Sequence, residues 1–141
     1  METRKVIIAS LISGTFFVCG LITGKFIYEE PSREIVAGYE KNEPNNHLTF
    51  TSVTNDLEDR WTVDNLQQIY MHSNQIEYES DGQTPADVHV WLKNPQSSTI
   101  LIRSKIWFND EGAIIKMGES DYREISHLDA VKMKEMIDYN E

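Results

Sequence analysis

The sequence predicts an α+β protein in which an N-terminal transmembrane helix precedes a small antiparallel sheet of about five strands, a short helix and a C-terminal amphipathic helix. Three observations predict it. Residues 6–28 are mostly apolar and carry one charge, Lys25, stretches between residues 47 and 117 alternate with the period of a strand, and residues 122–139 carry apolar side chains at helical spacing. The expected segments are a cytoplasmic tail (1–5), the span (6–28), a polar tether (29–46) and an extracytoplasmic domain (47–141).

The apolar segment 6–28 is long enough to cross a bilayer. A helix of this length extends about 35 Å, and a hydrocarbon core is about 30 Å thick. A cleaved signal peptide is the alternative, because Arg4 and Lys5 precede the apolar run and Val18-Cys19-Gly20 resembles a weak cleavage site. The apolar run continues well beyond that site, which favours a retained anchor.

Four small residues of this segment lie on one face of the expected helix. Gly20 and Gly24 form a GxxxG step, and Ala9 and Ser13 fall on the same stripe. Small residues allow two helix backbones to approach closely in lipid. The stripe therefore predicts helix packing, by self-association or with a partner, although small residues are also common in spans that pack on nothing.

The orientation of the span is predicted from the length of what flanks it. Positive charges are nearly balanced on its two sides, but a tail of five residues stays in the cytoplasm more readily than a whole domain does. We therefore expect the domain outside the cytoplasm, as in a bacterial inner membrane with the domain in the periplasm.

Composition limits the partners of the domain. The chain has 13 Lys and Arg against 23 Asp and Glu, a net charge of −10. This balance argues against nucleic acid, whose phosphates require a basic surface. Cys19 is the one cysteine, so an intramolecular disulfide and a cysteine metal cluster are excluded.

The tether and the first half of the domain contain several expected elements. Residues 32–37 are compatible with a short helix, 47–54 with a strand, 63–72 with a helix capped by Thr62, and 75–79 with a strand. Residues 55–60 form an acidic loop whose spacing fits no calcium-binding loop.

Residues 87–93, 99–108 and 113–117 predict a meander of three strands. Val88, Val90 and Leu92 would face the core, as would Ile100, Ile102, Ile106 and Phe108 on the next strand. If residue 93 pairs with residue 99, Asp87 lies opposite Lys105 and Trp91 lies opposite Leu101. The last helix, residues 122–139, would begin after a cap at Ser120 or Asp121 and pack on the sheet.

The opposite face of the meander is the strongest candidate for a binding surface. Its partner-binding residues are expected to be Trp91, Leu101, Arg103, Lys105 and Trp107, with Ile114, His89 and Lys116 beside them. Aromatic residues with arginine are typical of interface centres. The other interpretation is that a helix covers this face and makes it ordinary core.

These patterns favour a non-catalytic, membrane-anchored accessory protein whose extracytoplasmic domain binds a partner protein. The alternative is a domain that binds a small molecule or lipid between the sheet and the last helix. An enzyme is the third hypothesis. It has little support, because the histidines His47, His72, His89 and His127 form no metal-binding spacing and no serine lies in a nucleophile motif. No cofactor is expected.

Overall fold

The computed structural model describes residues 12–24, 31–40, 48–79 and 84–139, and the chain divides into two compact units at residues 30 and 31. The first unit contains a helix at residues 12–24. Among the described residues, no helix is both long and apolar enough to span a membrane. Residues 6–11 and 25–28 of the predicted span lie outside the described residues.

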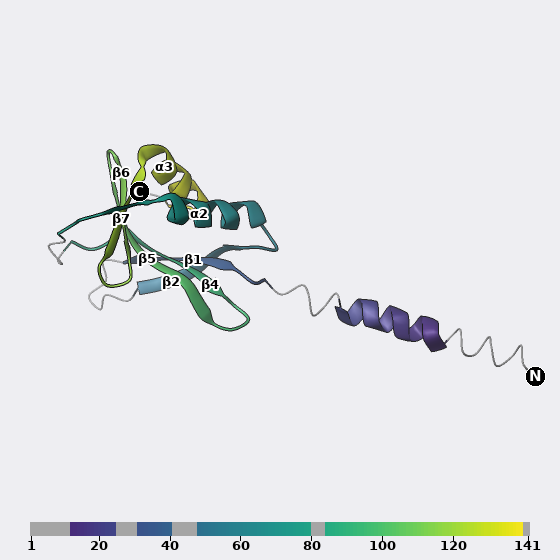
Figure 1. The fold of residues 1–141 in the computed structure, drawn as a ribbon. Helices are drawn as coiled ribbons and strands as arrows, with labels where there is room; N and C mark the ends of the chain where they lie inside the picture. Colours follow the sequence, from purple (N-terminus) through teal and green to yellow (C-terminus); the bar gives the residue numbers. More distant parts are fainter. Residues whose placement is uncertain (1–11, 25–30, 41–47, 80–83, 140–141) are drawn as a thin grey trace, which may run out of the picture. The chain divides into compact units, whose positions relative to one another are not determined.

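The second unit is an α+β domain built on one seven-stranded sheet (Figure 1). Its elements are β1 (Glu34–Glu40), β2 (Leu48–Asn55), α2 (Arg60–His72), β3 (Asn74–Ile76), β4 (Val88–Asn94), β5 (Thr99–Asn109), β6 (Gly112–Met117), β7 (Asp121–Ser126) and α3 (His127–Met136). All strand pairs are antiparallel, in the order β2-β1-β4-β5-β6-β7-β3.

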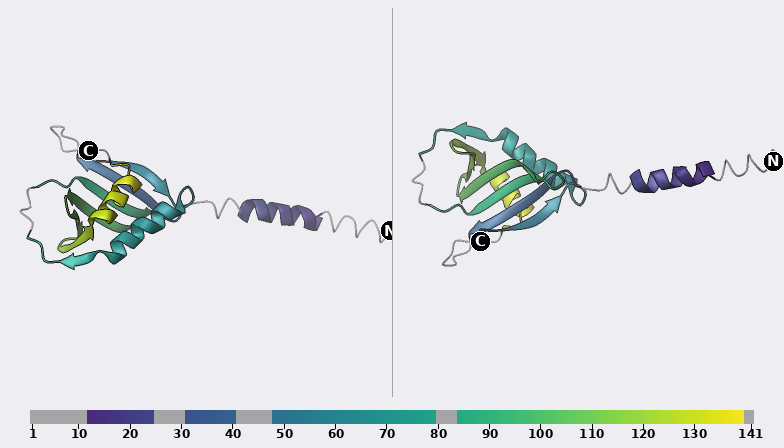
Figure 2. Two further views of the ribbon diagram at one scale, coloured as in Figure 1. Left: turned by 90° about the horizontal axis from the view of Figure 1, so that it is seen from above. Right: turned by 90° about the horizontal axis from the view of Figure 1, so that it is seen from below.

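Both helices of this domain lie on one face of the sheet. Figure 2 shows them in front of the strands from above and behind the strands from below. The core between helices and sheet contains Ile35 of β1, Val88, Val90 and Leu92 of β4, Ile106 of β5, Ile115 of β6, Leu66 of α2 and Met133 of α3, each at most 2 % exposed. The predicted inward set of β4 is thus confirmed.

Each helix begins at a side-chain cap. The Asp59 carboxylate accepts a hydrogen bond from the Thr62 amide at 3.0 Å, so Asp59 and not Thr62 caps α2. The Ser126 hydroxyl accepts from the Asp129 amide at 3.2 Å and caps α3. These bonds satisfy amide groups of the first turn that have no partner within the helix.

Two strands, β1 and β7, occupy residues for which the sequence predicted other structure. β1 occupies residues predicted to be a tether with a possible short helix, and it lies between β2 and β4 inside the sheet. β7 occupies residues predicted to be the start of the last helix, which therefore begins at His127. The β6–β7 hairpin turns at Gly118, whose φ of 73° is in the left-handed region that favours glycine. The sheet thus has seven strands where about five were predicted.

The predicted register of β4 and β5 is wrong by two residues over most of its length. Val88 pairs with Ile106 and Trp91 with Arg103, so neither Asp87 with Lys105 nor Trp91 with Leu101 is a pair. A bulge shifts the register between Leu92 and Lys93, and Leu101 has no partner on β4. A bulge inserts one extra residue and reverses the side-chain alternation beyond it. Ile100, predicted to face the core, therefore lies on the face opposite the helices.

Candidate functional site

The sheet face that α2 and α3 do not cover is the candidate site, and we call it the open face. Figure 2 shows its strands unobstructed in the view from below. The strand pairings place on it Phe50, His89, Trp91, Arg103, Lys105, Trp107, Ile114, Lys116 and Tyr122. Of the two interpretations of the tryptophan-bearing face, the one in which a helix covers it is not what the described structure contains.

An aromatic cluster forms the end of the open face nearest β2. The Phe50 and Trp91 rings lie 3.9 Å apart between centroids, and Phe50 meets His89 edge-on at 6.5 Å. Phe50 packs directly over Gly38, where an added Cβ would lie 2.7 Å from the ring. Glycine at this position therefore allows a ring of β2 to lie across β1 and reach β4.

The indole nitrogen of Trp91 is an exception in this cluster. It is buried and makes no hydrogen bond with any described residue. A buried donor without an acceptor is unfavourable by about 1–3 kcal/mol. The same indole receives the Arg103 guanidinium over its ring, 4.9 Å from the centroid. Trp91 is therefore held by its ring faces and not by a hydrogen bond.

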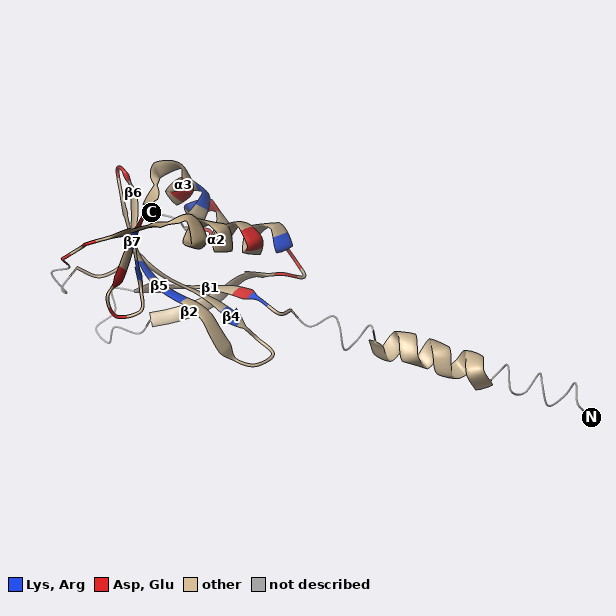
Figure 3. Cartoon of the chain, in the orientation of Figure 1, with Lys and Arg blue, Asp and Glu red and all other residues tan. Residues whose placement is uncertain are grey.

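Positive charge is concentrated in the middle of the open face (Figure 3). Lys105 of β5 is directly opposite Lys116 of β6, and on its other side it is opposite His89 of β4. The Lys116 ammonium lies 5.1 Å from the centroid of the Tyr122 ring. Arg103 and Lys105 are exposed. The face thus presents cations supported by aromatic rings.

A hollow lies at each end of the open face. One, of about 280 Å³, is lined by Val36, Phe50, Trp91, Lys93, Pro95, Ser98 and Ile100. The other, of about 300 Å³, is lined by Tyr78, Thr84, Pro85, Asp87, Trp107, Phe108, Asn109 and Ile114. In the second hollow the Trp107 indole donates to the Thr84 carbonyl at 3.3 Å, and the Asp87 carboxylate accepts from the Phe108 amide at 2.7 Å.

The structure places the five predicted partner-binding residues on strands β4 and β5. Trp91 and Trp107 are half-buried, Arg103 and Lys105 are exposed, and Leu101 is 50 % exposed at the bulge. Sequence reasoning missed Phe50 and the ion pair between Glu34 and Lys93 at 3.0 Å. Burial alone would raise the pKa of Glu34, but hydrogen bonds from Ser52 and Lys93 outweigh it and lower that pKa. Phe50 was detectable only as an aromatic residue on a strand whose pairing partner carries a glycine.

Three of the four predicted helix-packing residues lie within the part of the chain that the structure describes. Ser13, Gly20 and Gly24 belong to the helix at residues 12–24, whereas Ala9 lies outside the described residues. A Cβ added at Gly20 or Gly24 meets no described residue within 4 Å. The helix exposes the large apolar residues Ile12, Phe16, Phe17, Val18, Leu21 and Ile22, each more than half exposed.

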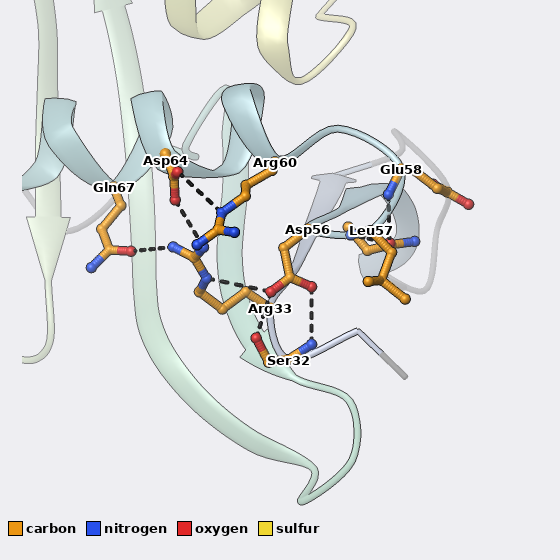
Figure 4. A network of polar contacts seen from close by, with 9 residues as sticks. Ser32, Arg33, Asp56, Leu57, Glu58, Arg60, Asp64 and Gln67 are labelled. Carbon is orange, nitrogen blue, oxygen red and sulfur yellow. Dashed lines mark hydrogen bonds and ion pairs between the residues drawn. The ribbon is translucent and has the colours of Figure 1, made fainter. Parts of the chain in front are cut away.

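A polar network joins the start of β1 to α2 (Figure 4). The Arg33 guanidinium donates to Gln67 at 2.9 Å and pairs with Asp64 at 2.8 Å, and the Asp56 carboxylate accepts from the Ser32 amide at 2.9 Å. Burial would raise the pKa of Asp56, but the hydrogen bonds from Ser32 and the nearby charge of Arg33 lower it. The acidic loop thus has a structural role, because it holds the beginning of the sheet.

The described residues contain no group of three or more His, Cys, Asp and Glu side chains placed to hold a metal ion. His72 and His127 are exposed at the two helices, His89 is 7 % exposed beneath Phe50, and His47 lies outside the description. Comparison of the chain with protein-family models, with curated proteins and with solved structures finds no match. Function is therefore inferred from the open face.

Proposed function

We propose that this chain is a single-pass, membrane-anchored accessory protein whose extracytoplasmic domain binds a partner protein through the open face. The observation that carries the proposal is the composition of a sheet face that the described helices leave uncovered. Trp91, Trp107 and Arg103, the residue types that dominate interface energetics, gather there. Leu101 adds an apolar side chain that is half exposed to water.

Aromatic and apolar side chains left uncovered by helices on one face of a small domain support a protein-binding role. Such patches are rare on monomeric proteins because leaving apolar area in water forgoes about 25 cal/mol per Å². The domain already has a full core on its other face, where Val88, Val90 and Ile106 are completely buried. The aromatic residues of the open face therefore lie outside the main core.

The N-terminal segment supports membrane attachment. Its described helix exposes apolar side chains around its circumference, including Phe16 and Phe17 at 73 % and 69 %. A helix that is apolar on every side is stable only in apolar surroundings, and the apolar sequence continues over residues 6–28. We place the N-terminus in the cytoplasm and the domain outside it, as in a bacterial inner membrane.

The small-residue stripe supplies a second contact in this proposal. Ser13, Gly20 and Gly24 lie within about 40° of one another on a helix with 3.6 residues per turn. Within the helix at residues 12–24, a Cβ built at Gly20 or Gly24 has open space around it, so a neighbouring helix can approach closely there. A weaker association of the Gly20→Leu variant in a membrane two-hybrid assay would therefore report a contact with another helix.

Site-specific photocrosslinking in the native membrane tests the binding surface. A photoreactive amino acid replaces the exposed Leu101 at the bulge of β5, two residues from Arg103 of the open face, or, as the matched control, Val131 on α3, which is 40 % exposed on the helix side. The proposal expects a discrete crosslinked product from position 101 and none from position 131. Equal crosslinking from both positions, or none from 101 with the protein intact in the membrane, contradicts it.

The small-molecule alternative is tested separately. Ligand pockets usually enclose 300–1,000 Å³, and the two hollows of the open face are at or below the lower end of that range. A ligand that fills one of them would raise the melting temperature in proportion to the logarithm of its concentration. Such a rise, abolished by Trp107→Ala but not by Val131→Ala, would favour this second function.

A further inference from the structure

The middle of the open face contains like charges in direct opposition. Lys105 of β5 and Lys116 of β6 are a directly opposed cross-strand pair. Like charges placed directly opposite one another destabilise an antiparallel sheet. Neither Arg103 nor Lys105 nor Lys116 forms an ion pair with a described residue. This is an unusual arrangement in a chain with 23 acidic residues available to neutralise it.

Among the described residues, the acidic side chains that share this face form no ion pair with these three cations. Glu34 is engaged by Lys93 at 3.0 Å, and Glu124 of β7 is opposite Ile114. The cations are instead oriented by rings, Arg103 over Trp91 and Lys116 over Tyr122. A guanidinium that stacks on a ring retains its planar set of N–H donors, which match the two oxygens of a carboxylate.

We propose that the open face binds an acidic segment of the partner protein, with Asp or Glu carboxylates at Arg103, Lys105 and Lys116. The inference rests on the proposed function and names the chemistry of the partner. Apolar side chains on either side of the acidic stretch pack against Trp91 and Trp107, beside the hollows of about 280 and 300 Å³. The partner removes the repulsion between the opposed lysines, which the free protein retains.

The net charge of the chain selects a short acidic segment over a long polyanion. A nucleic acid or an anionic membrane extends beyond the three cations and meets the field of a protein with a net charge of −10. A peptide segment contacts the local cluster, while more distant charges are screened beyond about 8 Å at physiological salt. The open face therefore attracts an anionic partner only where the contact is short enough to involve the local cations alone.

Peptide binding by the full-length protein, reconstituted in nanodiscs of zwitterionic phosphatidylcholine, tests the inference. The probes are a fluorescein-labelled peptide of alternating Glu and Leu, and a matched peptide of Gln and Leu. Fluorescence anisotropy should show binding of the Glu peptide, weakened between 50 and 300 mM salt, and at least tenfold weaker binding of the Gln peptide. No binding of the Glu peptide, or equal binding of both, overturns the inference.

The variant Lys105→Glu and its matched control Lys132→Glu separate a local site from a general effect of charge. Both substitutions make the net charge more negative by the same amount, but Lys132 is an exposed residue of α3 on the other side of the sheet. We expect about tenfold weaker binding of the Glu peptide by Lys105→Glu, because reversal both removes an attraction and adds a repulsion. Lys132→Glu should change the affinity less than twofold. Equal losses in the two variants contradict the proposal.

Two further measurements separate peptide binding from unfolding and from lipid binding. Lys105→Glu places opposite charges across from each other at Lys116, so its urea midpoint should be at least that of the wild type. If Lys105→Glu abolishes binding and also unfolds the domain, Lys105→Gln provides the same test with a smaller change. Vesicles of phosphatidylglycerol that compete with the Glu peptide at lower concentration would assign the cluster to lipid and overturn the proposal.

The failure of this inference is distinguishable from the failure of the proposed function. If crosslinking from position 101 persists unchanged in Lys105→Glu and at 300 mM salt, the open face binds a partner without using its cations. If crosslinking from position 101 is absent in the wild type, the proposed function itself fails. Loss of both peptide binding and crosslinking in Lys105→Glu, but not in Lys132→Glu, supports the acidic segment.

Discussion

Gly38→Ala should destabilise the domain because the added methyl group would clash with the ring of Phe50. The added Cβ would lie 2.7 Å from both Cδ1 and Cε1 of Phe50, closer than carbon atoms approach in folded proteins. Phe50 would have to leave Gly38 and give up its stacking on Trp91, which is now 3.9 Å away. Overpacking of this kind costs about 1–3 kcal/mol, and loss of the aromatic pair adds about 0.5–1.5 kcal/mol.

The same substitution should have the opposite sign once the ring is removed. Gly38 has no positive φ, so its backbone accepts alanine without strain. Replacing glycine by alanine at such a position stabilises by about 0.4–1 kcal/mol, chiefly by restricting the unfolded chain. In a Phe50→Ala background, Gly38→Ala should therefore raise the free energy of unfolding. The coupling between the two substitutions should be about 1.5–4.5 kcal/mol, the sum of the overpacking and aromatic contributions.

Urea unfolding of the four proteins of this cycle, followed by far-UV circular dichroism in detergent, measures the coupling. A matched control is Gly118→Ala, where φ is 73° and no described residue lies within 4 Å of an added Cβ. Its cost arises from the backbone, so Phe50→Ala should leave it unchanged. Equal destabilisation by Gly38→Ala in both backgrounds would refute the packing of Phe50 on Gly38.

Two further predictions concern groups away from the open face. Ser104→Ala should lower the free energy of unfolding by about 1–3 kcal/mol, because it leaves the buried Tyr70 hydroxyl without its 2.6 Å hydrogen bond, and adding Tyr70→Phe should recover part of that loss in a urea titration. The pKa of Asp56 is lowered in the folded domain, so its carboxylate contributes stability that is fully present above the ordinary pKa of 3.8 and is lost as the pH falls through the folded pKa. The urea midpoint should therefore fall more between pH 5 and pH 2.5 in the wild type than in Asp56→Asn, and parallel profiles would contradict the network of Figure 4.

The sequence predicted the elements whose local pattern agrees with their tertiary environment. β4 alternates Val88, Val90 and Leu92 with polar or aromatic residues because one of its faces meets the helices and the other belongs to the open face. The helix at residues 63–72 was predicted for the same reason, since Leu66 and Ile69 recur on its buried side, and in the structure it begins three residues earlier. For these elements the local sequence is sufficient to predict the secondary structure and the buried face.

Other elements depend on partners distant in the sequence. β1 contains Gly38 and lies in a polar stretch, and its role is apparent only when Phe50 is placed over that glycine. β7 carries Tyr122 and Ile125 three residues apart, a helical spacing that in fact places them on opposite faces of a strand. The turn glycine Gly118 was the available sign of a hairpin there.

The sequence indicated which side of the sheet the candidate-site residues occupy, but not which residues they contact. Trp91, Arg103 and Trp107 are on the expected side, because slipping the register by two residues preserves the alternation. The bulge at Leu101 then changed which residues meet. Trp91, predicted to lie opposite Leu101, pairs with Arg103, whose guanidinium lies over its ring, and Lys105 is opposite both His89 and Lys116. A bulge is a local accommodation of twist that no period-two pattern contains.

The core face supplies most of the stability of the domain, and this explains why the open face can retain unfavourable contacts. The core face buries side chains of both helices and of the sheet, including Leu66, Met133 and Ile106, and side-chain caps close both helices. A domain stabilised in this way tolerates a few tenths of a kcal/mol from the opposed lysines and about 1–3 kcal/mol from the indole N–H of Trp91. Groups that destabilise the free protein are the ones from which a partner gains most on binding, because its carboxylates relieve a repulsion in addition to forming an attraction. The open face is thus organised for a complex and not for the free domain.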